Sequence, residues 1–294
     1  MYSFLALLSG IVIAVMVQMN GSLGVLFGVY HAAFYIHIVG SVFAILTLLF
    51  TNKKHFLSVR KIPVWMYLGG VIGVATTVCN NLAYSHVSLT SIIALSLFAQ
   101  LIFSWLIDAF GWFGMVRHKD KGTSIPALLL SCVGIILMLD NISTTDGFWY
   151  ILFSLAAGIS VVLSRTVNAR LSEHTGALEG SLINHLAGLP VCLILALSVP
   201  EVSIPGQFTL WPWLGGILGV ATVVLCNITV SKIPAYRLTL LSFCGQIFCG
   251  ILFDFFDGSA LNKREFIAGL FVAAGILASQ LSVMWKQKKE EQIK

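Results

Sequence analysis

Ten long apolar runs divide the sequence, and they constrain its fold more than any other feature. Most of them reach the length of about 20 apolar residues that a helix needs to cross a lipid bilayer. They are too long and too continuous to be the alternating strands of a membrane β-barrel. The sequence therefore predicts an all-α integral membrane protein with ten transmembrane helices, at residues 4–28, 32–50, 64–85, 88–109, 125–140, 148–169, 178–199, 211–231, 235–255 and 265–285.

The chain has too few charged residues for a soluble domain. It is 58% hydrophobic and 10% charged, whereas a soluble domain carries about 25% charged residues. The six cysteines fall inside the apolar runs without a CxxC pair or the spacing of metal ligands, so we expect packing rather than disulfides or a metal site. No basic run alternates with aromatic residues, which argues against a nucleic-acid partner. The expected surroundings are the lipid bilayer.

The positive charges indicate how the chain is oriented in the membrane. Lys and Arg accumulate in cytoplasmic loops. If the N-terminus is cytoplasmic, two strongly basic loops also lie in the cytoplasm. Their basic residues are Lys53, Lys54, Arg60, Lys61, Arg117, Lys119 and Lys121. On the outer side, the basic residues are confined to Lys263 and Arg264. The first run lacks the basic region and cleavage site of a signal peptide. We therefore expect a plasma-membrane protein with both termini in the cytoplasm.

The two halves of the chain repeat each other. The segment LGGVIGVATT, which begins at Leu68, returns as LGGILGVATV from Leu214, with seven of ten residues identical. Shifts of 148 or 146 residues also align polar residues within apolar runs, namely Asn20 with Asn168, His37 with His185, Ser96 with Ser242, Gln100 with Gln246 and Asp108 with Asp254. This predicts two five-helix repeats, residues 1–145 and 146–294. Because five is odd, the second repeat would be inverted in the membrane.

An inverted repeat is typical of transporters that work by alternating access, with the substrate near the midplane. We expect a secondary-active transporter of a small metabolite or drug-like solute, coupled to protons and favouring export. The chain has no nucleotide-binding motif and no catalytic or zinc motif, so neither an enzyme nor a cofactor is expected. The alternative is a non-transporting membrane scaffold or regulatory protein. Either a monomer or a homodimer is compatible with the sequence.

Several segments resemble one branch of the drug/metabolite transporter (DMT) superfamily. The segments GQIFCGILFDFFDG (Gly245–Gly258) and AQLIFSWLIDAFGW (Ala99–Trp112) are similar to its fourth helix. VQMNGSLG (Val17–Gly24) resembles its first helix, AFYIHIVGS (Ala33–Ser41) its second, and the repeated glycine segment its third. This branch consists of five-helix domains of unknown function, single or fused in pairs. The resemblance implies a ten-helix transporter and leaves the substrate open.

Mirrored amides and hydroxyls are the candidates for substrate binding. Gln100 and Gln246 each lie about 12 residues into their helices, near the midplane at about 1.5 Å of rise per residue. Ser96 and Ser242 lie one turn earlier on the same faces. Asn20 and Asn168 complete the set. We expect the two glutamines to face each other and to contact substrate; for each of these residues a structural hydrogen bond is the alternative.

The histidines are the candidates for proton coupling. Imidazole is the side chain whose ordinary pKa, about 6.5, lies in the physiological range. Counted along the predicted spans, His37 falls in the outer layer with Asp254, and His185 in the inner layer with Asp108. Each layer would then hold one imidazole and one carboxylate. The alternative is that each histidine only hydrogen-bonds its neighbouring asparagine, Asn20 or Asn168.

The spans hold no acidic residue at mid-depth, which favours a neutral or zwitterionic substrate over a hydrophobic cation. Arg165 lies near the inner end of the sixth span. Its side chain would ordinarily extend to the cytoplasmic surface. Alternatively, it meets Asp108 or an anionic group of the substrate.

Overall fold

The computed structural model describes residues 1–51, 62–84, 86–117, 145–200 and 209–256, with isolated positions at 129–130, 133, 267, 270–271, 274–275 and 278. These ranges contain helices and no strand. The long helices are α1 (Tyr2–Phe27), α2 (Val29–Phe50), α3 (Leu68–Tyr84), α4 (Leu89–Phe110), α6 (Thr145–Thr175), α7 (Ala177–Leu197), α8 (Leu214–Thr229) and α9 (Ala235–Phe256). Short 3-10 turns precede α3 and α8 and follow α4, at Val64–Tyr67, Trp211–Trp213 and Trp112–Gly114.

The long helices agree with eight of the ten predicted spans. Within the described residues, seven helices are long and apolar enough to cross a membrane. The predicted spans 125–140 and 265–285 lie mostly outside the described residues. The largest difference is α6, which continues past the predicted end at residue 169 to Thr175. Its last turns are polar and carry an exposed ion pair between Arg170 and Glu173, 2.9 Å apart, so hydropathy ends before the helix does.

Single glycines join the first two helices of each half. Gly28 separates α1 from α2 with φ 76°, and Gly176 separates α6 from α7 with φ 105°. Only glycine adopts such positive φ values readily. The two residues are 148 positions apart, which is the shift that aligns the helices they connect. The same backbone geometry therefore recurs at equivalent places in the two halves.

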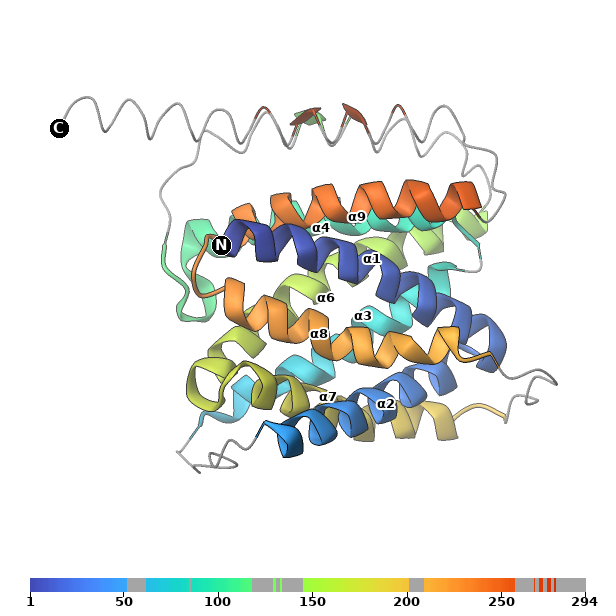
Figure 1. Ribbon diagram of the computed structural model, residues 1–294. Coiled ribbons are helices and arrows are strands. Elements are labelled where there is room, and N and C mark those ends of the chain that lie inside the picture. Colours follow the sequence, from blue (N-terminus) through green and yellow to red (C-terminus); the bar gives the residue numbers. More distant parts are fainter. Residues whose placement is uncertain are drawn as a thin grey trace.

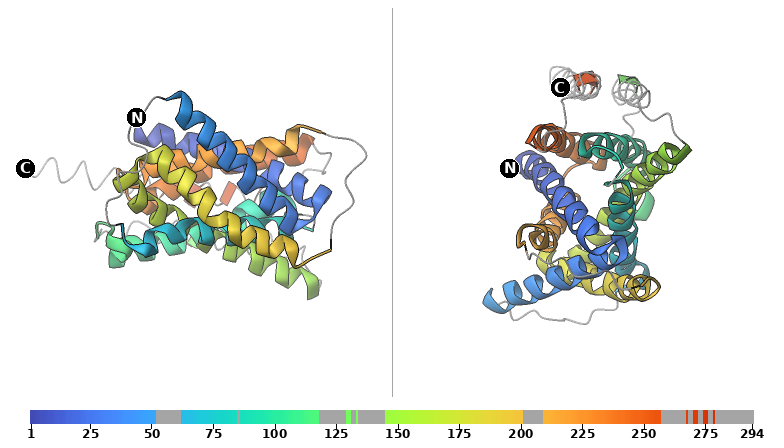
Figure 2. Two further views of the ribbon diagram at one scale, coloured as in Figure 1. Left: turned by 90° about the horizontal axis from the view of Figure 1, so that it is seen from below. Right: turned by 90° about the vertical axis from the view of Figure 1, so that its right-hand side faces the viewer.

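The helices form a bundle in which contacts between the halves dominate. Helices α4 and α9 lie together at one face and α2 and α7 at the opposite face (Figure 1). Between them, α1 packs against α8 and α9 of the second half, and α6 packs against α3 and α4 of the first. The end-on view in Figure 2 shows the same arrangement along the helix axes. Each of these contacts has a counterpart with the two halves exchanged.

Glycines allow the closest approaches between these helices. A Cβ atom at Gly10 of α1 would lie 1.8 Å from the backbone oxygen of Ser242 in α9. At Gly158 of α6 it would lie 2.0 Å from the backbone oxygen of Ser96 in α4. Small residues are the usual means by which helices pack closely in lipid, where no hydrophobic force drives them together. Both contacts require the absence of a side chain.

The outer surface is apolar where a membrane would surround it. Large hydrophobic side chains stand exposed along the outward faces of α2 and α7, among them Leu49, Phe50, Ile194 and Leu197. The interior holds an apolar cluster where α1, α4 and α9 meet, which includes Val17, Leu97 and Phe243. Polar side chains are buried beside it. This distribution is that of a protein in lipid, whose polar groups are turned inward.

Candidate functional site

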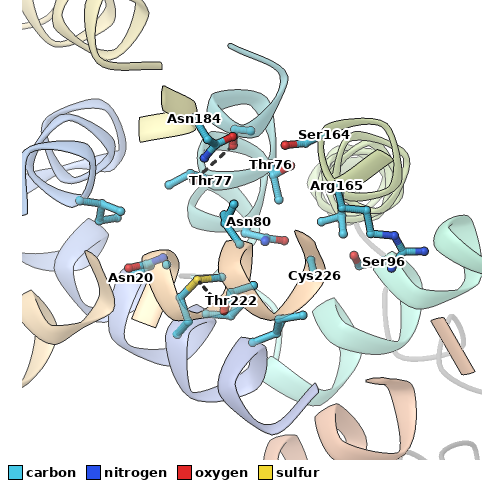
Figure 3. Close-up of a pocket in the computed structure, with 18 of the residues that line it drawn as sticks. Asn20, Thr76, Thr77, Asn80, Ser96, Ser164, Arg165, Asn184, Thr222 and Cys226 are labelled. Atoms are coloured by element: carbon cyan, nitrogen blue, oxygen red, sulfur yellow. Dashed lines mark hydrogen bonds between the residues drawn. The ribbon is translucent and has the colours of Figure 1, made fainter. Parts of the chain in front are cut away.

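A cavity with many polar residues in its wall lies in the middle of the bundle (Figure 3). Residues of all eight long helices line it. The space not filled by atoms is about 1050 Å³, part of it open to solvent. Its polar lining consists of Asn20, His37, Thr76, Thr77, Asn80, Ser96, Gln100, Ser164, Arg165, Asn168, Asn184, His185, Thr222, Asn227 and Gln246.

The two glutamines line this cavity from opposite halves of the chain. The Nε2 atom of Gln100 donates to Ser96 Oγ at 3.2 Å, and the Nε2 atom of Gln246 donates to Ser242 Oγ at 3.0 Å. Each bond joins residues one turn apart, because positions i and i+4 share a helix face. Ser96 also lines the cavity, whereas Ser242 is not among its lining residues. Ser242 therefore orients Gln246 from behind the wall.

The asparagines belong to the same wall but differ in their bonds. Asn168 Nδ2 donates to Asn184 Oδ1 at 2.7 Å and to Ser164 Oγ at 3.2 Å. The Oδ1 atoms of Asn20 and Asn168 are buried without a hydrogen-bond partner among the described residues. Each of these oxygens lies against a glycine, Gly215 for Asn20 and Gly69 for Asn168, where a Cβ atom would be 2.1 Å away. The first glycine of each repeated glycine segment thus makes room for an amide of the other half.

The two histidines lie side by side, which corrects the expected separation into an outer and an inner layer. Their ring centroids are 5.7 Å apart where α2 crosses α7. The predicted second span began at residue 32, whereas α2 begins at Val29, so His37 is nearer the middle of its helix than the count suggested. His185 has the same position within α7. Both imidazoles are therefore central and line one cavity.

The hydrogen bonds of the histidines are also not those expected in the alternative interpretation. The Nδ1 atom of His37 lies 2.8 Å from Ala33 O, and that of His185 lies 2.9 Å from Ser181 O. Each partner is a carbonyl oxygen of the same helix and not Asn20 or Asn168. Cys192 Sγ is a further neighbour of His37 Nδ1 at 3.4 Å. A neutral ring that donates from Nδ1 leaves Nε2 as an acceptor.

Asp108 does not line the cavity beside the histidines, as the layered arrangement required. Asp108 is buried in α4, and its Oδ1 accepts a hydrogen bond from the backbone N–H of Ala235 at 3.2 Å, at the start of α9. A carboxylate is favourable at a helix N-terminus, where unpaired N–H groups and the helix dipole attract it. The side chain of Asp254 lies outside the described residues.

Arg165 is buried, so the expectation that it extends to the cytoplasmic surface is wrong. Its side chain is 6% exposed and lines the cavity from α6. The guanidinium donates from Nη2 to Ser104 Oγ at 2.8 Å and to Thr239 Oγ1, and from Nη1 to Gln100 Oε1 at 3.5 Å. These acceptors are fixed on α4 and α9, so the side chain is held between helices rather than extended along α6.

Sequence reasoning missed the polar face of α3. Thr76, Thr77 and Asn80 line the cavity, and Thr222 lies opposite them on α8. The signal was present, because Thr76 and Thr222 occupy the same place in the repeated segment, 146 residues apart. Asn184 was missed as well. It has no such signal, since its counterpart at a shift of 148 is the apolar Ile36.

Replacing Gln100 with leucine is expected to weaken ligand binding about two- to tenfold, while the protein still folds. The change keeps the side-chain volume but removes an amide from the cavity wall, and one hydrogen bond contributes about 0.5–1.5 kcal/mol. The measurement is ligand affinity, by isothermal titration, for the first compound that stabilises the purified protein. Ser242→Ala is the control behind the wall, with a smaller effect. Equal affinities in the wild type and in Gln100→Leu would remove this residue from the site.

The helical bundle has an apolar outer surface and a central cavity with many polar residues in its wall, which is the architecture of a multi-span membrane protein. The chain belongs to the family described as "Putative inner membrane exporter, YdcZ", whose model matches residues 1–137 and 149–278. This family is part of the DMT superfamily, so the resemblance seen in the sequence is confirmed. Membership supports a transporter role in the inner membrane, with a small-molecule substrate.

Solved structures share the fold. Among 26 matching chains, one described as "Crystal structure of protein" has a TM-score of 0.64 at 14% sequence identity, and the match covers 95% of each chain. At this identity the likeness shows the fold alone. No curated protein matches the chain.

Within the described residues, no three or more His, Cys, Asp or Glu side chains are grouped as a metal site would require.

Proposed function

We propose that the protein exports a small solute by alternating access, with the central cavity as the substrate site between two inverted five-helix halves. One observation carries the proposal: equivalent residues of both halves line the same cavity. They are Asn20 and Asn168, His37 and His185, Gly73 and Gly219, Thr76 and Thr222, and Gln100 and Gln246. A cavity shared in this way changes its accessible side when the halves exchange conformations.

The packing between the halves supports the same mechanism. α1 lies on α8 and α9, and α6 lies on α3 and α4, so each half contributes one helix to the other's wall. A relative movement of the halves therefore opens one end of the cavity as it closes the other. The proposed orientation, with both termini in the cytoplasm, rests on the distribution of Lys and Arg.

Proton coupling is assigned to the pair of histidines. With Nδ1 of each ring bonded to a helix carbonyl, Nε2 is the atom that takes up a proton. The groups around the pair are the other imidazole, Cys192 beside His37, and Arg165 in the same cavity wall. Two imidazoles with ring centroids 5.7 Å apart disfavour double protonation. The pair therefore acts as one site for a single proton.

A cysteine at Thr76 tests alternating access, in a variant whose six native cysteines are replaced. Position 76 lies on the cavity wall, and we expect a membrane-impermeant maleimide to label it in both right-side-out and inside-out vesicles. Val42→Cys is the control, because Val42 stands exposed to lipid on α2, where an aqueous reagent does not react. Labelling of position 76 from one side only would contradict the proposal and favour a scaffold with a fixed crevice.

A further inference from the structure

The cavity wall carries one fixed charge among the described residues, and it is positive. Arg165 is the charged residue in the lining, which otherwise consists of amides, hydroxyls, imidazoles, a thiol and apolar groups. No described Asp or Glu lines the cavity. The sequence suggested a neutral or zwitterionic substrate from the absence of acids at mid-depth. The burial of Arg165 beside the cavity changes that expectation.

The charge of Arg165 is not neutralised by an ion pair with any described carboxylate. Its acceptors are the hydroxyls of Ser104 and Thr239 and the amide oxygen of Gln100. Asp108 acts on Arg165 electrostatically, and its Oδ1 atom accepts a hydrogen bond at the start of α9. The Nε atom of Arg165 is buried without a hydrogen-bond partner among the described residues. Burying a cation in this way is unfavourable unless an anion compensates it at some stage of the cycle.

The charge also distinguishes the two halves. At a shift of 148, the counterpart of Arg165 is Val17, which packs in the apolar cluster with Phe243. Thr239, an acceptor of Arg165, corresponds at a shift of 146 to Ile93 of the same cluster. Arg165 lies near Ser96 where α6 and α4 line the cavity (Figure 3), whereas Val17 and Ile93 add apolar groups to the lining. A solute with a negative and an apolar or hydroxylated end matches this polarity.

We propose, on the basis of the transport function above, that the substrate is a small organic acid whose carboxylate is attracted by Arg165. Guanidinium and carboxylate form charge-assisted hydrogen bonds, for which the Nε–H and one Nη–H are suited. Thr76 and Asn80 on the neighbouring helix α3 supply hydrogen bonds to the remainder of the molecule. An ammonium group of a zwitterion or amine finds no described carboxylate in the wall, so net anions are preferred to both.

The test compares ligands of one skeleton that differ in charge. Thermal stability of the detergent-purified protein is measured with benzoate, benzamide and benzylamine, and with a panel of aliphatic mono- and dicarboxylates, sugars, nucleosides and amines. A ligand that binds the folded state raises the apparent stability. We expect stabilisation by carboxylates, and little or none by the matched amides and amines.

Two variants assign the effect to Arg165. In Arg165→Gln, the affinity for the best carboxylate should fall about tenfold or more, since hydrogen bonds to charged groups are about twice as strong as neutral ones. Arg165→Lys should recover part of it. Arg170→Gln, which removes a partly exposed arginine of the same helix outside the cavity lining, is the matched control and should bind as the wild type does.

The outcomes separate this inference from the proposed function. Stabilisation by neutral compounds or amines alone, or a carboxylate affinity unchanged in Arg165→Gln, would overturn the anion site and leave transport standing. A protein stabilised by no compound of any class would contradict both. If Arg165→Gln fails to fold, the comparison of charge classes on the wild type still decides the question, because it needs no variant.

Discussion

Gly70→Ala is expected to destabilise the protein severely, whereas Gly73→Ala, one turn further along α3, is not. A Cβ atom at position 70 would lie 2.0 Å from the backbone oxygen of Asn184 in α7, and backbone cannot move aside as a flexible side chain can. At position 73 the nearest atom would be Ser164 Oγ at 3.4 Å, an ordinary contact. Overpacking costs about 1–3 kcal/mol even where side chains can adjust, so we expect little folded Gly70→Ala protein.

The measurement is thermal unfolding of both variants in the same detergent, together with the yield of monodisperse protein. Alanine is the better helix former by about 1 kcal/mol, so Gly73→Ala should be as stable as the wild type or more so. The two substitutions are chemically identical and differ only in the space available. Equal stability of the two variants would show that α3 and α7 are not packed as described.

The double variant His37→Gln, His185→Gln is expected to lose the ability to concentrate substrate when a pH gradient is imposed. With one proton carried per solute, a gradient of one pH unit can sustain about a tenfold concentration ratio. Glutamine keeps hydrogen-bonding capacity but binds no proton at these pH values. Exchange of solute for solute requires no proton and should persist. The measurement is uptake of labelled substrate into proteoliposomes with and without a gradient.

His174→Gln is the control for this experiment, since His174 is exposed at the end of α6 and lies outside the cavity lining. Uptake of substrate by this variant should follow the pH gradient, as uptake by the wild type does. If the double variant still concentrates substrate, the histidines are structural, and Asp108 and Asp254 become the next candidates for proton coupling.

The sequence predicts the helices well because hydropathy reports directly on the solvent that each segment meets. The predicted spans 4–28 and 178–199 differ from α1 and α7 by two residues or fewer at either end. Prediction of helix ends from hydropathy fails where a helix extends beyond the lipid. The polar end of α6 continues as helix through backbone hydrogen bonds and the Arg170–Glu173 pair, which a count of apolar residues does not register.

Residues that are identical at equivalent positions of the two repeats predict the candidate site, whereas their estimated depth in the membrane does not. Comparing the halves finds Gln100 with Gln246 and His37 with His185, and it would also have found Thr76 with Thr222. Assigning depth by counting from uncertain span ends placed the histidines in separate layers, whereas a helix crossing brings them together. Arg165 has no arginine at the equivalent position of the other repeat, so comparing the halves does not find it. Its burial depends on hydrogen bonds to Ser104 and Thr239 on other helices. Such tertiary contacts have no local signature.

The placement of α1 against α8 and α9, and of α6 against α3 and α4, makes the two halves intertwined rather than adjacent. Gly10 of α1 accommodates the backbone of α9, and Gly158 of α6 that of α4. A half expressed alone would therefore expose the surfaces that its first helix and its third and fourth helices bury against the other half. Sequence similarity divides the chain into two repeats, but these shared contacts do not divide it into two units that fold independently. We therefore expect the smallest folding unit to be the whole bundle, with a single unfolding transition.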